Sequence, residues 1–184
     1  LSSELGPVTS VKVLDKLTYA GSLSNLSEIA NDPRFEFILG DICDEELVNK
    51  SINAGDVIVH FAAESHVDRS IESPGDFIQT NIIGTFKLLQ ASRDYLNSIK
   101  NAKDLDRYKN FRFLHVSTDE VYGSLHSSDQ PSNERDPYKP NSPYSASKAA
   151  GDHLVRAWFQ TYKLPVLTIN SANNFGPYQF PEKL

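Results

Sequence analysis

The chain has 184 residues with a formal net charge of −6, and 39% of its residues are hydrophobic. This length suits one domain with a substantial core, and the acidic balance argues against general binding to nucleic acid or to an anionic membrane surface. No apolar run approaches the roughly 20 residues of a membrane-spanning helix, and one cysteine with five scattered histidines argues against an internal disulfide or a structural zinc site. We therefore expect a cytoplasmic protein without a metal.

Short β-rich runs alternate with helical patterns along the chain. The runs span residues 11–14, 35–39, 57–62, 111–116 and 166–169. A short helix is expected after Asp44, a longer one from Ser73-Pro74 to about Ile99, and another from Ser142-Pro143, because each start carries a capping signal. Residues 100–110 are expected to be a polar connector, and residues 124–141 a long loop of a functional or lid-like kind. The alternation predicts an α/β fold with a doubly wound parallel sheet of the Rossmann type.

Carboxylates and small residues follow the first three runs. Asp15 closes the first run, where a nucleotide-binding sheet of this type places the carboxylate that binds the adenosine ribose; such a carboxylate favours NAD because it repels a 2′-phosphate. It is equally a common turn residue. Asp41 would fit near the adenine edge or would cap a helix. Ala62 and Ala63 would let a flat ring or a pyrophosphate approach the backbone, or would simply pack tightly.

The glycine-rich phosphate loop and the strand before it should precede Asp15 by about 20 residues. Fourteen residues precede Asp15, and Gly6 is the one glycine among them. In the usual 3-2-1-4-5-6 strand order the missing strand lies between the second and the fourth, so we expect the sheet to be split in two. Residues 1–184 are therefore predicted to form an incomplete NAD-binding domain that is a fragment of a longer protein and essentially lacks a C-terminal substrate domain.

A tyrosine and a lysine four residues apart are predicted to share one face at the start of the last helix. They are Tyr144 and Lys148. A tyrosine that acts as a base must ionise far below its ordinary pKa of about 10, and a fall to about 7 requires roughly 4 kcal/mol. The neighbouring lysine, a cationic nicotinamide and the helix N-terminus could supply this together.

Hydroxyl, carboxylate and amide groups follow the last two runs, at the edge where ligands bind in such sheets. Thr118, Asp119 and Glu120 come after the fourth run, and Asn173 and Asn174 come after the fifth. Two adjacent carboxylates can divide acid and base work if their surroundings separate their pKa values, although they could also form a solvated acidic turn. The asparagines suit hydrogen bonding to a sugar or a nicotinamide.

Taken together, these motifs make the chain resemble the dTDP-glucose 4,6-dehydratases, a family of the extended short-chain dehydrogenase/reductase superfamily. The resemblance covers essentially the whole chain and rests on residues 15–21, 62–70, 117–123, 144–148 and 173–184. Epimerases and decarboxylases of the superfamily usually lack the Asp-Glu pair after the threonine. They remain alternatives, as does a truncated, non-catalytic remnant that serves as a binding module.

The resemblance implies a lyase reaction with tightly held NAD. Tyr144, aided by Lys148 and Thr118, would take the proton of the sugar 4-hydroxyl while hydride leaves carbon 4 for NAD. Glu120 would then remove the proton of carbon 5, Asp119 would protonate the departing 6-hydroxyl, and the hydride would return to carbon 6. The product would be dTDP-4-keto-6-deoxyglucose, an intermediate of deoxysugar biosynthesis.

The resemblance also assigns binding residues and a partner. The substrate dTDP-glucose would contact Ser65, Thr118 and Asn173. A homodimer would form through the helices at 76–99 and 143–162, whose apolar faces could equally be buried within one monomer. The expected NAD contacts are Asp15, Lys16, Leu17, Thr18, Asp41, Ile42, Phe61, Ala62, Ala63, Glu64, Ser65, Thr80, Tyr144, Lys148 and Asn174.

Overall fold

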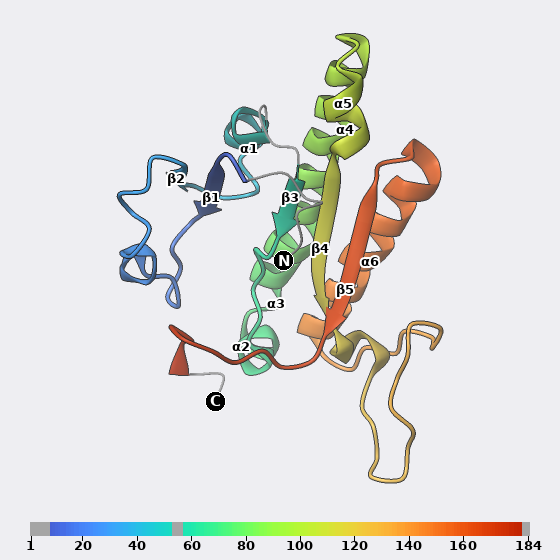
Figure 1. Ribbon diagram of the computed structural model, residues 1–184. Helices are drawn as coiled ribbons and strands as arrows, with labels where there is room; N and C mark the ends of the chain where they lie inside the picture. Colours follow the sequence, from blue (N-terminus) through green and yellow to red (C-terminus); the bar gives the residue numbers. More distant parts are fainter. Residues whose placement is uncertain (1–7, 53–56, 182–184) are drawn as a thin grey trace.

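Two parallel sheets form the framework of the chain in the computed structural model, which describes residues 8–52 and 57–181 (Figure 1). The smaller sheet pairs β1 (Val11–Asp15) with β2 (Phe35–Leu39). The larger one has the order β3-β4-β5, formed by Val57–His60, Arg112–Thr118 and Val166–Ser171. The α/β class and the divided sheet are therefore confirmed. Gly6 and residues 182–184 of the last motif lie outside the described residues.

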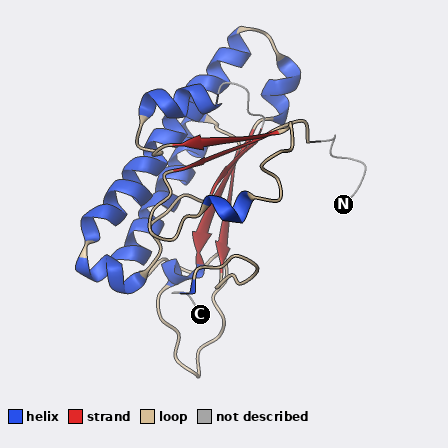
Figure 2. Cartoon of the chain, turned by 90° about the vertical axis from the view of Figure 1, so that its left-hand side faces the viewer, coloured by secondary structure: helices blue, strands red, loops and turns tan. Residues whose placement is uncertain are grey.

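Helices cover one side of the strands, as Figure 2 shows. The longest are α4 (Thr85–Asn101) and α6 (Pro143–Tyr162), which pack on each other and on the larger sheet; α1 (Glu45–Ile52) packs against α4. The shorter helical segments are α2 (Val67–Glu72), α3 (Pro74–Phe77), a π-helical segment η2 (Ile78–Gly84), α5 (Leu105–Asn110) and the 3₁₀ helices η1 (Leu23–Leu26) and η3 (Asp119–Tyr122). Within the described ranges, no helix is both long enough and apolar enough to cross a bilayer.

The predicted helix starts are correct. The Ser142 hydroxyl accepts a hydrogen bond from the Ser145 amide at 3.0 Å, and the Ser145 hydroxyl in turn accepts from the Ser142 amide, which makes a reciprocal capping box. The Asp44 carboxylate accepts from the Leu47 amide at 3.0 Å. Ser73 precedes Pro74 as expected, but its side chain makes no capping hydrogen bond. These local signals fix where α6, α1 and α3 begin.

Three expectations about the elements are corrected. The expected single helix from residue 74 to about 99 is a continuous helical stretch of three segments, α3, η2 and α4, because residues 78–84 are π-helical. The Asn81 side chain in the π-helical segment bonds to the loop after β3. The expected connector at 100–110 contains α5, whose N-terminus is capped by the Asp104 carboxylate bonding to the Arg107 amide at 3.2 Å. The expected run at 57–62 ends as a strand at His60, and the helix α2 was not anticipated.

The hydrophobic core lies between the larger sheet and helices α1, α4 and α6. Its fully enclosed members include Leu89 of α4, Phe113 of β4 and Val155 of α6, all with 0–1% of their surface exposed. Apolar residues at helical spacing therefore bury one face of each helix against the alternating inner face of the strands. This packing holds the N-terminal end of α6 against the carboxyl end of β4.

The segment after β5 meets the turn after β1 beside the smaller sheet. In Figure 1 the C-terminal segment, drawn in red, runs from β5 toward the β1–β2 side. There the Tyr178 hydroxyl lies 2.7 Å from a Glu28 carboxylate oxygen, and Phe180 meets the Tyr19 ring edge-on with centroids 5.6 Å apart. The Arg69 guanidinium covers the same Tyr19 ring at 3.8 Å. Aromatic contacts thus connect the turn after β1, α2 and the segment after β5.

Gly123 ends η3 in a conformation that L side chains rarely adopt, with φ of 94°. A Cβ there would lie 2.5 Å from the Lys139 backbone carbonyl oxygen. We predict that Gly123→Ala lowers the free energy of unfolding by about 1–3 kcal/mol, measured by urea denaturation. Gly75→Ala is the matched control, since a Cβ there meets no atom within 4 Å and alanine favours a helix. Equal stabilities of the two variants would contradict this account.

Candidate active site

A cavity of about 460 Å³ opens at the carboxyl ends of β4 and β5, beside the start of α6. Residues from five separate parts of the chain line it. Those predicted as site residues are Phe61, Ala63, Ser65, Thr118, Glu120, Tyr144, Lys148, Asn173 and Asn174. Parallel strands bring their carboxyl ends to one edge of a sheet, which is why segments so distant in sequence meet here.

The first turns of α6 hold Tyr144 and Lys148 toward this cavity. Both side chains are largely buried, with 7% and 5% of the surface exposed. The Ser147 hydroxyl between them donates to the Tyr144 carbonyl at 2.7 Å and accepts from the Asn81 amide at 2.8 Å. The Lys148 ammonium donates to the Val116 carbonyl at 2.7 Å. A backbone carbonyl of β4 and a side-chain amide of η2 therefore set the orientation of this part of α6.

The surroundings act on the two groups in opposite ways. Burial lowers the pKa of Lys148 to about 8, against a smaller raising effect of the Asp152 charge. Burial also raises the pKa of Tyr144 to about 12; a hydrogen bond with Thr118 lowers it, while the charges of Glu120 and Asp119 raise it. The expected fall of the tyrosine pKa is therefore not provided by the described residues. Ionisation near pH 7 would require a further 7 kcal/mol, approximately, from a bound cation.

The two adjacent carboxylates lie in different places. The Thr118 hydroxyl caps η3 by accepting from the Glu120 amide at 3.2 Å, which fixes the turn that carries both acids. Glu120 is half-buried and lines the cavity that holds Tyr144, whereas Asp119 is exposed. Asp119 lines a neighbouring cavity of about 600 Å³ that Glu120 also lines. Glu120 is thus the carboxylate that faces both spaces.

A second group of the predicted residues gathers around the Lys16 ammonium. Its nitrogen lies 3.5 Å from an Asp41 oxygen and 3.7 Å from a Glu64 oxygen, and it donates to the Thr80 hydroxyl at 3.4 Å. Burial opposes ionisation of Asp41, but the Cys43 amide and the Lys16 charge outweigh it and lower the pKa of Asp41. The Asp15 carboxylate, exposed at the end of β1, accepts from the Leu17 amide at 2.7 Å. Lys16 therefore connects the ends of β1, β2 and β3.

The remaining predicted residues lie near these two groups but do not line the 460 Å³ cavity. Thr18 continues the exposed turn after β1, and Ile42 is buried behind Asp41. The main chain of Glu64 exchanges two hydrogen bonds of 2.9 Å with the Asn81 side chain, which fixes the loop after β3. The residues outside the cavity lining are Asp15, Lys16, Leu17, Thr18, Asp41, Ile42, Ala62, Glu64 and Thr80.

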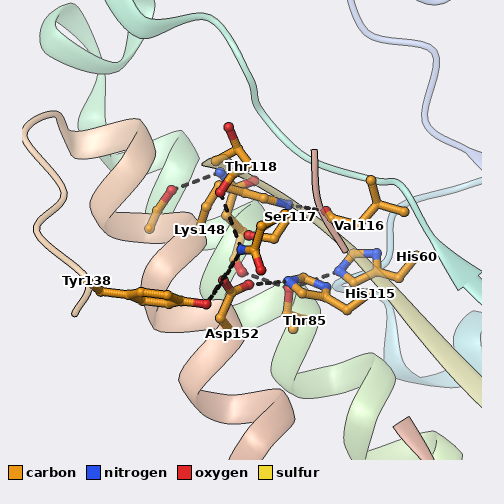
Figure 3. A network of polar contacts seen from close by, with 12 residues as sticks. His60, Thr85, His115, Val116, Ser117, Thr118, Tyr138, Lys148 and Asp152 are labelled. Carbon is orange, nitrogen blue, oxygen red and sulfur yellow. Dashed lines mark hydrogen bonds and ion pairs between the residues drawn. The ribbon is translucent and has the colours of Figure 1, made fainter. Parts of the chain in front are cut away.

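A buried polar network that the sequence analysis missed lies behind Lys148 (Figure 3). His60 and His115 are register partners on β3 and β4, and their ring centroids are 5.2 Å apart. His115 Nε2 lies 3.1 Å from an Asp152 oxygen, and His60 Nε2 lies 2.9 Å from the Thr85 hydroxyl. Burial lowers the pKa of both histidines, so both rings are neutral at pH 7. The one available signal was a histidine in each of two apolar strands.

The side chains at the strand ends suit an organic dinucleotide such as NAD. Across residues 8–52 and 57–181, no three histidine, cysteine or acidic side chains are grouped so that they could hold a metal ion. Asp15 presents an exposed carboxylate for a ribose diol, and Phe61, 71% exposed, presents an apolar surface beside small residues. Both lie at strand ends, as an extended dinucleotide requires. Asp15 and Phe61 are therefore compatible with the adenosine end and the middle of a dinucleotide.

We predict a pH-dependent stability that Lys148 causes. Its pKa is about 8 in the folded chain and 10.5 ordinarily, so above pH 8 the unfolded chain binds more protons and the free energy of unfolding rises with pH. Between pH 8 and 10 the wild type should gain about 2–3 kcal/mol relative to Lys148→Met, which lacks the titrating group. Urea unfolding of both proteins at pH 7, 8, 9 and 10 measures the difference. Parallel curves would refute a buried, titrating ammonium.

Comparisons with known proteins agree on one family. The family model described as GDP-mannose 4,6 dehydratase matches residues 1–184. A dTDP-glucose 4,6-dehydratase of Neisseria gonorrhoeae is 55% identical over 177 residues, which are 95% of this chain and 50% of that protein. An enzyme of the same name from Escherichia coli is 51% identical over 95% of this chain. The chain spans about half the length of the curated relatives it matches.

Solved structures give the same result. The dTDP-glucose 4,6-dehydratase DesIV of Streptomyces venezuelae, solved with NAD bound, is 47% identical and superposes with a TM-score of 0.85 over 97% of this chain and 51% of that one. The corresponding enzyme of Bacillus anthracis, also with NAD, is 40% identical with a TM-score of 0.78 over 95% of this chain and 50% of that one. The chain therefore belongs to the GDP-mannose 4,6 dehydratase family, within the extended short-chain dehydrogenase/reductase superfamily, and resembles the dTDP-glucose 4,6-dehydratases in sequence and fold.

Proposed function

We propose that this chain supplies the NAD-binding and catalytic residues of an enzyme that dehydrates dTDP-glucose to dTDP-4-keto-6-deoxyglucose. One observation carries the proposal: Thr118, Glu120, Tyr144 and Lys148 line a single cavity at the carboxyl end of β4. A phenol, an ammonium, a hydroxyl and a carboxylate around one space are the groups that oxidation of an alcohol followed by β-elimination requires. The names of the relatives supply the substrate.

The cofactor would lie along the strand ends. Asp15 would hold the adenosine ribose, Asp41 and Ile42 would lie near the adenine, and Phe61 to Ser65 would lie beneath the middle of the dinucleotide, with Asn174 beside the nicotinamide. When bound, NAD supplies a hydride acceptor at carbon 4 of the sugar and the same hydride for carbon 6. Relatives of known structure that bind NAD support this assignment.

Residues of this cavity and of the adjoining one would then carry out four proton transfers. Tyr144 takes the proton of the sugar 4-hydroxyl, and Thr118, which shares a hydrogen bond with Tyr144, orients that hydroxyl. Lys148, one turn away, stabilises the phenolate with its charge. Glu120 removes the proton of carbon 5, made acidic by the adjacent ketone, and Asp119 in its protonated form donates to the departing 6-hydroxyl, which leaves as water. When the hydride adds to carbon 6, Glu120 returns a proton to carbon 5 and so completes the 4-keto-6-deoxy product.

The sugar would be held by groups around the same space. Ser65 and Asn173 line the cavity opposite Tyr144 and would donate to the sugar hydroxyls with Thr118. Asp119 lies in the adjoining cavity, so the proposal requires the 6-hydroxyl to point past Glu120 toward that second space. This placement separates the surroundings of the acid from those of the base.

A homodimer through α4 and α6 is part of the proposal. Both helices bury one face in the core through residues such as Leu88, Leu89 and Val155. This part of their apolar surface serves the monomer, as the alternative expected. Phe159 and Tyr162 of α6 each remain 46% exposed beyond that core. These rings would lie in the dimer contact. A cytoplasmic location likewise remains a prediction.

The proposed reaction predicts a specific product. The natural polypeptide that contains this chain, incubated with dTDP-glucose and NAD, should release water and form a 4-keto-6-deoxy product, detected by mass spectrometry and by absorbance of the enolised ketone in alkali. Formation of a galactose epimer from the same substrate, or release of carbon dioxide when a nucleotide-linked uronate is supplied instead, would identify one of the alternative activities. Residues 1–184 assayed alongside test whether the chain is catalytic or a binding module.

The proposed role of Glu120 as the base at carbon 5 predicts the effect of removing its charge. Glu120→Gln should retain bound NAD and initial oxidation but should lose exchange of the carbon 5 hydrogen with deuterated water by about 10²–10⁴-fold. Glu72→Gln, an exposed carboxylate on α2, serves as the matched control and should exchange like the wild type. Unchanged exchange in Glu120→Gln would remove this residue from the mechanism.

A further inference from the structure

Asp152 is a carboxylate enclosed in the protein, with 5% of its surface exposed. Polar side chains from several elements surround it. His115 Nε2 lies 3.1 Å from one oxygen, and the Tyr138 hydroxyl and the Asn170 amide donate to the other at 2.8 and 3.1 Å. Ser117, also buried, helps to lower the pKa of the carboxyl. A buried carboxylate with this many donors is held in its ionised form.

The donors come from separate elements, so Asp152 is a junction between them. Figure 3 shows His115 and Ser117 reaching it from β4 and Tyr138 reaching it from the long loop. Asn170, on β5, also donates to the Thr118 carbonyl at 3.3 Å. Burial alone would raise the pKa of Asp152, but the bonds from His115, Ser117 and Tyr138 outweigh it and lower that pKa. The negative charge is thus fixed in one place.

Asp152 stands one helical turn after Lys148 on α6. The lysine ammonium donates a hydrogen bond to the Val116 carbonyl at 2.7 Å (Figure 3). The neighbouring rings of His60 and His115 are neutral, so the buried charges of this network are one cation and one anion. A cation away from water needs a fixed negative partner to remain charged.

We propose that Asp152 is a positioning residue that acts through Lys148: its clamped carboxylate keeps the lysine charged and aimed at the Val116 carbonyl, beside Tyr144. Its importance for catalysis rests on the function proposed above, whereas its effect on the lysine does not. The ring of donors has a role of its own here. It prevents the carboxylate from swinging into a direct pair with Lys148, which would draw the ammonium away from the tyrosine.

The other titratable groups on the elements packed against α6 are neutral, face the cavity or lie at the surface. His60 of β3 and His115 of β4 are neutral, and Glu120 of η3 and Tyr144 face the cavity. η2 and β5 contribute neutral side chains such as Asn81 and Asn170. The acids of α2 and α3 are exposed, and those of α4 and its neighbour pair with basic residues at the surface: Asp68, Glu72, Asp76, Asp94 with Arg93, and Glu45 with Lys87.

The experiment is a titration of Lys148 by NMR in the full chain, labelled with ¹³C at the lysine Cε and assigned with Lys148→Met. In the wild type the midpoint should lie at about 8. Asp152→Asn keeps the shape of the side chain but removes its charge, and it should lower the Lys148 midpoint by about one pH unit or more. Asp94→Asn, an exposed carboxylate on α4, is the matched control and should leave the midpoint unchanged. A folded Asp152→Asn with an unchanged midpoint overturns the proposal.

A second measurement decides the matter if Asp152→Asn does not fold. Because two interacting groups affect each other equally, the Asp152 ¹³Cγ shift of the wild type should show a step at the Lys148 midpoint. The absence of a step overturns the proposal. Activity separates the two claims: if the wild type forms no 4-keto product the proposed function fails, while the titrations still test Asp152. If it does, Asp152→Asn should lower kcat at pH 7 more than at pH 6, which a merely structural role would not produce.

Discussion

The chemistry proposed for this chain depends on keeping one ammonium charged inside the protein. Lys148 is 5% exposed, and removing a cation from water opposes its ionisation. The fold compensates with the Val116 carbonyl, which accepts from the ammonium, and with the Asp152 charge one turn further along α6. These contacts require α6 to begin where Ser142 begins it and β4 to end at Thr118. Capping, register and core packing therefore all converge on the position of a single nitrogen.

A second lysine performs a comparable task for the architecture. The two parallel sheets share no strand pairing among the described residues, yet the Lys16 ammonium contacts acids that follow β2 and β3 and a hydroxyl on η2. The carboxylates are partly exposed, so each pair alone contributes little. Their convergence at one point nevertheless fixes the relative position of the strand ends, which the proposed dinucleotide site would span.

The sequence was sufficient for the parts of the molecule that depend on local chemistry. All five strands overlap the β-rich runs of the sequence, and α1 and α6 begin directly after their capping residues. The four-residue spacing places Tyr144 and Lys148 on one face of α6. The π-helical segment escaped prediction because it preserves the apolar face of an ordinary helix. The raised pKa of Tyr144 and the ring around Asp152 escaped for a different reason. Both depend on which side chains the sheet register and the helix packing bring together, and no local pattern encodes that.

The aromatic contacts between the ends of the chain have a mechanical consequence. Tyr19 and Phe180 both line the 460 Å³ cavity, and they touch each other although they are separated by almost the entire sequence. Arg69 of α2 covers the Tyr19 ring. The Tyr178 hydroxyl bonds to Glu28 and so holds the segment that carries Phe180. The wall of the cavity is therefore a seam between the earliest and latest parts of the chain. Because the same two rings line the cavity and join these segments, displacement of either ring would change both the cavity and the contact between the segments.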